Sequence, residues 1–417
     1  MTTVLRNIAQ LATCPAAAAQ QDAGVVDKAA LVIADERIAW AGPESRLPRE
    51  YADERAVDCG RRLVIPGLID CHTHLCFGGW RGDEFAMRLA GRSYQEIAAA
   101  GGGIRHTVEH TRAAATHALL DKASRALDGM LDLGVTTVEC KSGYGLDYDN
   151  ELRLLEIYAE LGAHPVDLVA TFLGAHVVPD EYRNDRGAYL ALLRERLLPE
   201  VARRGLARFC DVFVEEGAFS LAEARKILQT AASLGLGLKV HADQLSDGGG
   251  ARLAAEMGAV SAEHLEYVSA AGIAALAAAG TVAVSLPLAS MYLREPYMPA
   301  RRLLEAGVRV AVATDFNPGS APSYHLPLAM TLACLNQQMT PAEALTGATT
   351  VAARALRLED RAGSLEAGYR ADIAVIDAPN LNHWLYHFRG NACCGVIKSG
   401  RWIKKLADPA GPCPGPG

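Results

Sequence analysis

Two histidines separated by a single residue, His72 and His74, follow the apolar run VIPGLIDC at residues 64–71. Side chains of an extended chain alternate between two faces, so both imidazoles point to the same side. With a third imidazole and a carboxylate from elsewhere, they would complete a four-ligand site for zinc, and iron or manganese accepts the same donors. An isolated pair of this kind is common, so the assignment depends on finding the partners.

Polar residues that could supply these partners close the later apolar runs of the chain. In chain order they are Glu139 and Lys141, His176, His241, Glu263 and His264, and Asp315. With His72 and His74, five of the twelve histidines stand at such positions. In barrels of alternating strands and helices, catalytic groups gather at the carboxyl ends of the strands. The pattern therefore predicts a hydrolase with one metal site.

Several of these residues also have an ordinary structural interpretation. His241 alone could be a hydrogen-bonded histidine of the core, and Asp315 alone could cap a helix that begins near Pro318. Lys141 could bridge two metal ions, as lysines do in some two-metal barrels. Because a one-metal site needs no such ligand, we interpret Lys141 as part of a structural ion pair.

A competing metal motif lies at residues 106–110, where His106 and His110 frame the H-x-x-E-H pattern of one zinc peptidase group. A long helical stretch follows, so the required geometry is attainable. Histidine and glutamate at this spacing are nevertheless ordinary on a solvated helix face, and no third ligand stands nearby. Without that context the motif is the weaker hypothesis.

The elements that must position the candidate residues alternate between apolar β-branched runs and longer helical stretches. Strands are expected at residues 63–70, 136–141, 166–173, 208–215, 237–241, 259–264, 281–286 and 308–314. Short, continuously apolar strands belong in a parallel sheet that is covered on both faces. The pattern predicts an α/β fold, a (β/α)8 TIM-like barrel over residues 63–359, with a doubly wound sheet as the alternative.

The two ends of the chain have a different pattern, with short alternating segments and turn signals typical of β structure. Neither end is long enough for a core of its own. We therefore expect residues 1–62 and 360–407 to form one small β-sandwich domain together. The stretch Ala16–Asp22 is a local elaboration to which the sequence assigns no role, and the Pro- and Gly-rich tail at 408–417 is expected to be disordered.

Composition narrows the class of partner. The chain has 41 Lys and Arg against 48 Asp and Glu, a formal net charge of −7, which argues against a nucleic acid partner. Ten cysteines without framework spacing, and an amino terminus without signal-peptide layout, predict a cytoplasmic protein with free thiols. The uncharged stretch Tyr267–Leu293 contains Gly280 and Pro287, so we expect a buried helix at 270–279 and a buried strand at 281–286 rather than a membrane span.

This combination of an HxH pair, a barrel and paired β-rich ends resembles the amidohydrolase superfamily, in particular its mononuclear branch. A finer resemblance, to the enzymes of this superfamily that open the imidazolone ring in histidine degradation, rests on six segments that agree in order and spacing. These are CHTHLCFGGWRGDEF (71–85), GGGI (101–104), ECKSGYGL (139–146), FLGAH (172–176), HADQ (241–244) and TDFNPGS (314–320).

The resemblance implies hydrolysis of 4-imidazolone-5-propanoate to N-formimidoyl-L-glutamate by a homodimer with one zinc or iron ion. The implied metal ligands are His72, His74, His241 and Asp315. Asp315 would also exchange the proton of the attacking water, and His176 and His264 are candidates for polarising the carbonyl or holding the oxyanion. The implied substrate contacts are Arg81, which matches a propanoate carboxylate, with Tyr144, His176, Gln244, Asn317, Gly319 and Ser320.

Two other functions remain open at this point. The first is another cyclic amidohydrolase or a deaminase of the same superfamily, with the same metal ligands and different pocket residues. The second is a catalytically silent relative that serves as a binding protein. A silent relative is expected to have lost metal ligands, whereas here every expected ligand is present.

Overall fold

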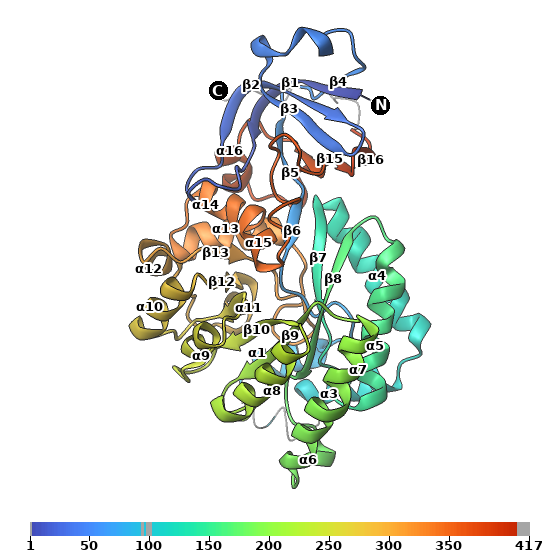
Figure 1. The fold of residues 1–417 in the computed structure, drawn as a ribbon, viewed down its shortest axis with the longest axis vertical. Helices are drawn as coiled ribbons and strands as arrows, with labels where there is room; N and C mark the ends of the chain where they lie inside the picture. The colour runs from blue at the N-terminus through green and yellow to red at the C-terminus, as the bar shows by residue number, and fades with distance from the viewer. Residues whose placement is uncertain (1, 93–95, 97–101, 407–417) are drawn as a thin grey trace.

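Parallel strands in the middle of the chain form one continuous sheet that curls into a barrel (Figure 1). The computed structural model describes residues 2–92, 96 and 102–406. The sheet has eight strands in the order β13-β12-β11-β10-β9-β8-β7-β6. Their bounds are β6 Leu68–Asp70, β7 Val135–Lys141, β8 Asp167–Ala175, β9 Phe209–Val214, β10 Gly237–Ala242, β11 Ser261–His264, β12 Val282–Ser285 and β13 Val310–Val312. Each predicted strand is present, and the predicted barrel is confirmed.

The strand predicted at residues 63–70 is in fact two strands that belong to different sheets. β5 (Leu63–Pro66) pairs with strands of the small terminal sheet, and only β6 enters the barrel beside β7. Gly67 separates them where the chain passes closely over β7. A Cβ atom at Gly67 would lie 2.3 Å from Thr136 Oγ1, so a larger residue does not fit there.

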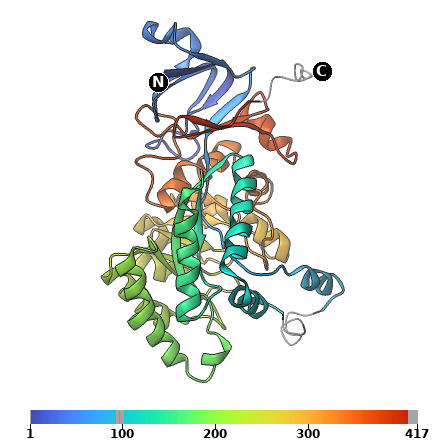
Figure 2. The same ribbon diagram turned by 90° about the vertical axis from the view of Figure 1, so that its right-hand side faces the viewer.

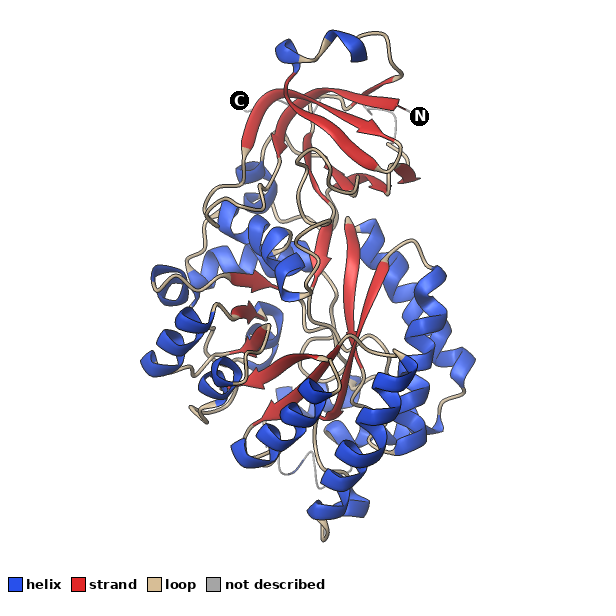
Figure 3. Cartoon of the chain, in the orientation of Figure 1, coloured by secondary structure: helices blue, strands red, loops and turns tan. Residues whose placement is uncertain are grey.

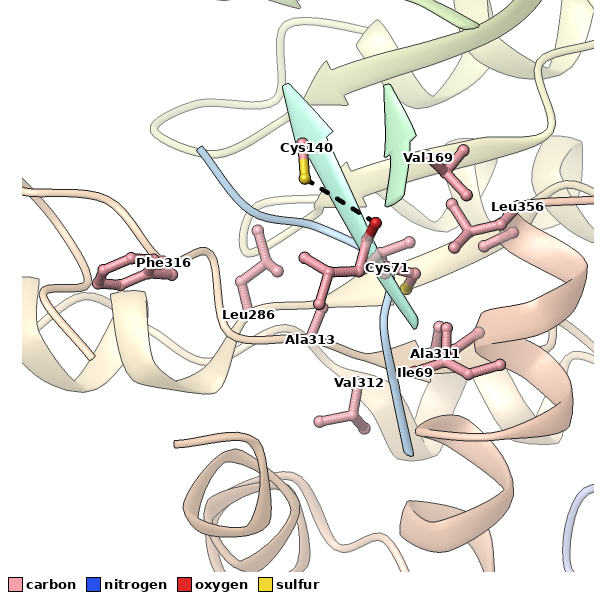
Figure 4. Close-up of a cluster of buried hydrophobic side chains, with 14 of the residues drawn as sticks. Ile69, Cys71, Cys140, Val169, Leu286, Ala311, Val312, Ala313, Phe316 and Leu356 are labelled. Carbon is pink, nitrogen blue, oxygen red and sulfur yellow. Dashed lines mark hydrogen bonds between the residues drawn. The ribbon is translucent and has the colours of Figure 1, made fainter. Parts of the chain in front are cut away.

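The first and last barrel strands meet through side chains and loops. Thr314 donates from its backbone N and from Oγ1 to the two carboxylate oxygens of Asp70, at 3.1 and 2.6 Å. Beyond the strands, His74 N donates to Phe316 O at 2.9 Å and Asp315 N donates to His72 O at 3.0 Å. Figure 4 shows the apolar side chains on this side of the barrel, with Ile69 of β6 near Ala311 of β13. These contacts between β6 and β13 bring together the two ends of the barrel sheet and the candidate ligands that follow them.

Helices cover the outside of the barrel (Figures 2 and 3). Side-chain caps stabilise the N-termini of several helices. In α8 and α14, for example, Ser220 and Thr340 form capping boxes with Glu223 and Glu343. The bounds are α1 Gly82–Leu89, α3 Ile104–Ala113, α4 Thr116–Asp132, α5 Tyr148–Glu160, α6 Arg186–Ala191, α7 Leu198–Arg204, α8 Leu221–Ser233, α9 Gly250–Glu256, α10 Ala270–Ala279, α11 Pro287–Leu293, α12 Ala300–Glu305, α13 Leu326–Gln337, α14 Pro341–Gly347, α15 Thr350–Ala355 and α16 Leu381–Tyr386. The predicted helix at 270–279 and strand at 281–286 are present as α10 and β12, but α10 is buried on one side only, and the unpredicted helix α11 follows. No described helix is both long and apolar enough to cross a bilayer.

Both ends of the chain build the second sheet, which lies above the barrel in Figure 1. Its strands follow the order β16-β15-β14-β5-β1-β2-β3, and β4 pairs with β1. Hydrogen bonds join these strands into one continuous sheet, and residues from both chain ends share its apolar core. The strands are β1 Thr2–Ala12, β2 Val25–Ala34, β3 Arg37–Pro43, β4 Ala56–Asp58, β14 Ile373–Ile376, β15 Cys393–Lys398 and β16 Arg401–Lys404. The tail predicted at 408–417 lies outside the described residues.

The loop Ala16–Asp22, to which the sequence assigns no role, ties the small sheet to the barrel through Gln20. Its amide Nε2 donates to Val310 O at 2.6 Å, and its Oε1 accepts from Val310 N at 2.9 Å. Thr346 Oγ1 of α14 donates to Gln20 O at 2.7 Å. Gln20 thus satisfies the backbone at the start of β13, where a neighbouring strand would otherwise have to pair.

Candidate active site

Five histidines that the sequence places at strand ends meet at the carboxyl end of the barrel. The ring centroid of His72 lies 5.4 Å from that of His74 and 4.6 Å from that of His241. His176 stacks on His74 at 5.2 Å, and His264 lies 5.4 Å from His241. Four of these rings are buried, and His176 is half-buried. The strands β6, β8, β10 and β11 therefore bring together residues that lie far apart in the sequence.

Asp315 joins this cluster from the loop that follows β13. Its Oδ1 lies 3.3 Å from His72 Nε2 and 3.4 Å from His74 Nε2. The backbone of Asp315 is left-handed, with a φ of 56°, and that of His264 is left-handed at 76°. Non-glycine residues adopt this region at a cost in free energy that the surrounding structure must offset, and such residues concentrate at functional sites. Burial raises the pKa of Asp315, but contacts with His72 and His74 outweigh it and hold the pKa well below its usual value.

The donor atoms of this cluster fit a metal ion. His72, His74 and Asp315 offer ligand atoms within 4.8 Å of one another, and His72, His241 and His264 form a second group at the same spacing. Both ring nitrogens of His72 and His241, and Nδ1 of His74, are buried without a well-aligned hydrogen bond to any described residue. Buried polar atoms are normally satisfied, so a bound cation is the simplest partner for Nε2 of His72 and of His241.

Protonation of the three imidazoles is governed by burial and by nearby carboxylates. Burial lowers the pKa of His74 to about 4 and lowers that of His241 as well, which keeps both rings neutral and able to donate a lone pair. Burial also acts to lower the pKa of His72, but the carboxylates of Glu263 and Asp315 outweigh it and raise the pKa to about 9. The shift shows how strongly this position attracts positive charge.

Beneath the histidines lies a layer of fully buried charges inside the barrel. Lys141 Nζ lies 2.8 Å from Asp211 Oδ2 and 2.8 Å from Glu263 Oε2. Lys239 Nζ lies 2.7 Å from Glu263 Oε1 and 3.1 Å from Glu139 Oε1. The structural ion-pair interpretation of Lys141 is confirmed. Its ammonium stands between carboxylates that, together with His241, could otherwise hold a second cation.

The candidate carboxylate-binding residue Arg81 is held by two neighbours on opposite sides. Arg81 Nε donates to Glu84 Oε2 at 3.0 Å, and Glu84 Oε1 accepts from Gly103 N at 2.9 Å. The guanidinium lies against Gly319, where an added Cβ would be 2.1 Å from Arg81 Nη1. Because Glu84 engages Nε, the two terminal nitrogens remain the natural fork for a substrate carboxylate.

The side chain of Asn317 is fully used within its own loop. Its Oδ1 accepts from the backbone N atoms of Gly319 and Ser320, both at 2.8 Å. Its Nδ2 donates to Asp315 O at 2.6 Å and to Ser320 Oγ at 2.8 Å. Ser320 Oγ in turn donates to Asp315 Oδ2 at 3.2 Å. An amide has two donors and one oxygen with two lone pairs, so Asn317 has no capacity left for a ligand and instead fixes Asp315 and Gly319.

The remaining candidates differ in how closely they join the cluster. Tyr144 lies 5.4 Å from His176 between ring centroids, and burial raises the pKa of its hydroxyl well above the ordinary value. His176 Nδ1 lies 3.0 Å from Gly143 O, and His264 Nδ1 lies 3.6 Å from Glu266 Oε1. Gln244 follows β10 and is half-buried, and no described residue forms a side-chain hydrogen bond with it.

The competing motif at 106–110 forms no such site. His106 and His110 lie on α3 with ring centroids 3.9 Å apart, and His110 Nδ1 bonds to His106 O at 2.8 Å. In the described part of the chain, the groups that could hold a metal all lie at the barrel centre and contain neither residue. The structure therefore offers no support for a peptidase-type metal site on α3.

Sequence reasoning missed the residues that support the candidate ligands. The sequence provides no reason to select Glu84 or Asp211, and it marks Glu263 only as a polar residue at a strand end without a role. A usable signal exists, because Glu139 and Lys141 on β7, and Lys239 and His241 on β10, are two positions apart in the sequence. Side chains two apart on a strand share a face, so a site residue at a strand end predicts that its neighbour two positions earlier points into the barrel.

Comparison with known proteins agrees with the fold. The amidohydrolase family matches residues 63–403, so the chain belongs to the amidohydrolase family. Among solved structures, a triazine hydrolase variant superposes with a TM-score of 0.75 at 19% identity, covering 98% of this chain and 96% of that one. A zinc-bound adenosine deaminase from Xanthomonas campestris reaches 0.70 at 20% identity, covering 97% and 94%. At these identities the likeness concerns the fold alone.

Closer relatives define the particular group. The imidazolonepropionase of Symbiobacterium thermophilum is 51% identical over 389 residues, which span 92% of each chain. That of Geobacillus kaustophilus is 46% identical over 387 residues, 92% of this chain and 91% of the relative. Within the amidohydrolases, the chain is a member of the imidazolonepropionase family.

Proposed function

We propose that this protein hydrolyses the ring amide C–N bond of 4-imidazolone-5-propanoate to N-formimidoyl-L-glutamate in histidine degradation, with one bound zinc or iron ion. The observation that carries the proposal is that His72, His74, His241 and Asp315 lie together at the barrel mouth, with Nε2 of His72 and of His241 buried and without a hydrogen-bond partner among the described residues. The relatives named imidazolonepropionase, at 46–51% identity over most of the chain, support the choice of substrate.

The metal would be held by the three imidazoles and the Asp315 carboxylate, a donor set that suits zinc and iron alike. When bound there, the ion would act as a Lewis acid and would make water a stronger nucleophile near neutral pH. The protein contributes a fixed, buried arrangement of donors. Lys141 lies between the carboxylates of Asp211 and Glu263 below these donors, where a second cation would otherwise bind, so a single ion suffices.

Asp315 is the residue we assign to proton transfer. Its carboxylate is ionised, because His72 and His74 hold its pKa well below the usual value, and it can therefore accept a proton from the attacking water. Ser320 Oγ donates to Oδ2 at 3.2 Å and helps to fix the carboxylate plane. The protonated carboxyl group of Asp315 can then return the proton to the ring nitrogen as the C–N bond breaks.

His176 and His264 take different parts in this proposal. Gly143 O can only accept, so the proton of His176 is on Nδ1, and burial lowers its pKa well below the ordinary value. Neutral His176 therefore presents Nε2 as an acceptor, which suits an N–H of the substrate ring. His264 Nδ1 lies 3.6 Å from Glu266 Oε1, and we assign His264 the role of hydrogen-bond donor to the carbonyl oxygen.

Arg81 would bind the propanoate carboxylate through its two terminal nitrogens, and Tyr144 and Gln244 would contact the substrate from the loops after β7 and β10. Gly319 and Ser320 lie beside Arg81 and Asp315 and would border the bound substrate. We assign Asn317 the role of fixing this loop, because its amide already forms hydrogen bonds with Asp315, Gly319 and Ser320.

Metal removal tests the proposal directly. Chelator-treated protein should lose hydrolysis of 4-imidazolone-5-propanoate, and one equivalent of Zn²⁺ or Fe²⁺ per chain should restore it with N-formimidoyl-L-glutamate as the product. Metal-free protein that retains the full rate would contradict a metal-dependent mechanism.

We also propose a homodimer in the cytoplasm. Exposed aromatic side chains support an interface near α16, where Tyr386 is 83% and Phe388 61% exposed. The nine described cysteines are free thiols, which suits a reducing compartment. Light scattering of the purified protein distinguishes a dimer from a monomer.

A further inference from the structure

Two of the candidate metal-binding histidines contact a buried carboxylate through the ring nitrogen that faces away from Asp315. His72 Nδ1 lies 2.7 Å from Glu263 Oε2, and His241 Nδ1 lies 2.9 Å from Asp211 Oδ2. Both contacts are bent rather than in line with the ring N–H. Hydrogen bonds at catalytic sites are often poorly aligned until the site is filled, and then tighten.

A carboxylate beside Nδ1 determines which ring nitrogen carries the proton. It favours the tautomer with the proton on Nδ1, which leaves the lone pair on Nε2 for a metal ion. The orientation of the His72 ring agrees with this tautomer, because its Nε2 lies 3.3 Å from Asp315 Oδ1. One side of this ring thus faces a carboxylate of the barrel interior, and the other faces the proposed metal position.

The carboxylates are themselves held in place by the buried lysines. Lys141 Nζ contacts both of them at 2.8 Å, and Lys239 Nζ contacts Glu263 at 2.7 Å. Asp211, Glu263, Lys141 and Lys239 have no exposed surface. Because no water reaches these groups, each charge depends on its partner, and moving one would leave another buried and unpaired.

We propose that Glu263 and Asp211 are positioning residues that hold His72 and His241 with Nε2 directed at the metal, and that Lys141 links the two carboxylates into one rigid unit. The inference rests on the proposed metal-dependent function, since it concerns the affinity of the same site. It assigns to the buried layer a role beyond packing, namely raising metal affinity by fixing the tautomer and orientation of two ligands.

Glu139 provides a matched control within the same layer. It is equally buried and contacts the same two lysines, with Oε2 at 3.0 Å from Lys141 Nζ and Oε1 at 3.1 Å from Lys239 Nζ. In the described part of the chain, Glu139 forms no ion pair with a histidine. Glu139→Gln and Glu263→Gln therefore remove the same charge from the same layer, and only the second removes a partner of a proposed ligand.

The test is the affinity of the apoprotein for Zn²⁺, measured by competition with a chromogenic chelator, together with the Tm of each apoprotein. Glu263→Gln and Asp211→Asn should weaken Zn²⁺ binding by roughly 10- to 100-fold, the usual effect of losing such a partner. Glu139→Gln should change affinity by less than about threefold, although its Tm should fall as well.

A second pair of variants keeps the comparison valid if single changes unfold the protein. Lys239 contacts both glutamates, so Glu263→Gln/Lys239→Met and Glu139→Gln/Lys239→Met each remove one negative and one positive charge. Only the first should lose Zn²⁺ affinity. Equal affinities within either pair, or wild-type affinity in Glu263→Gln and Asp211→Asn, would overturn the inference. Wild-type protein that binds no Zn²⁺ would instead remove the proposed metal function on which it rests.

Discussion

Replacing Gly319 by alanine offers a way to displace Arg81 without touching it. The new Cβ would lie 2.1 Å from Arg81 Nη1 and 2.8 Å from Cζ, whereas ordinary contact begins near 3.4 Å. The guanidinium must therefore withdraw by about 1.3 Å, the difference between 3.4 and 2.1 Å. It cannot do so freely, because Glu84 holds Nε at 3.0 Å. A misplacement of about 1 Å costs roughly 100-fold in rate, or ~2.7 kcal/mol of transition-state stabilisation.

We expect Gly319→Ala to lower kcat/KM for 4-imidazolone-5-propanoate about 100-fold, mainly through KM, with metal content and Tm close to the wild type. Initial rates with substrate generated by urocanase measure the effect. Gly162→Ala is the control, because a Cβ at Gly162 meets nothing within 4 Å at a site on the far side of the barrel.

A double-mutant cycle with Arg81→Ala shows whether Gly319 acts through Arg81. If it does, Arg81→Ala and Arg81→Ala/Gly319→Ala should have the same kcat/KM within about 0.5 kcal/mol, because the second change has nothing left to displace. Full additivity would refute the reasoning and assign Gly319 a direct contact with substrate. Wild-type kinetics in Gly319→Ala would show that Arg81 is not held as the structure places it.

Two further predictions concern the proposed base and a titrating lysine. Asp315→Asn should lower kcat by at least about 1,000-fold in protein reloaded with metal, because the amide cannot accept the proton; near-normal turnover would exclude Asp315 as the base. Burial lowers the pKa of Lys122 from 10.5 to about 8, so the unfolded chain binds more protons than the native state between these values. The contribution of this group to the free energy of unfolding should rise with pH across that window. The Tm of the wild type minus that of Lys122→Met should therefore increase from pH 7.5 to 10, and a constant difference would contradict the lowered pKa.

The barrel could be predicted because its strands are continuously buried. β12 and β13 are buried at every position, and apart from Ser285 they consist of Val and Ala, which gives the apolar runs that the sequence shows. The division of residues 63–70 could not be predicted in the same way, since both halves are apolar. It depends on pairing between β5 and β14, which are about 300 residues apart, and on the close approach of Gly67 to Thr136.

The candidate ligands could be predicted because strand ends of a barrel must converge, whatever the register. The support for those ligands could not, because it depends on which side chains of neighbouring strands stand at the same height. His241 and Glu263 are register partners on β10 and β11, whereas Glu263 contacts His72 from across the barrel. The use of the Asn317 amide within its own loop is likewise a matter of turn geometry that residue type alone does not determine.

The central claim is that this metal site opens the imidazolone ring rather than another cyclic substrate. Its most direct test is the kcat/KM of the zinc-loaded protein for 4-imidazolone-5-propanoate, measured beside dihydroorotate, hydantoin and guanine. We predict that the imidazolone is hydrolysed at least about 1,000-fold more efficiently than the others, because Arg81 and His176 match its carboxylate and its ring N–H. Comparable or faster turnover of any of the other three would contradict the account.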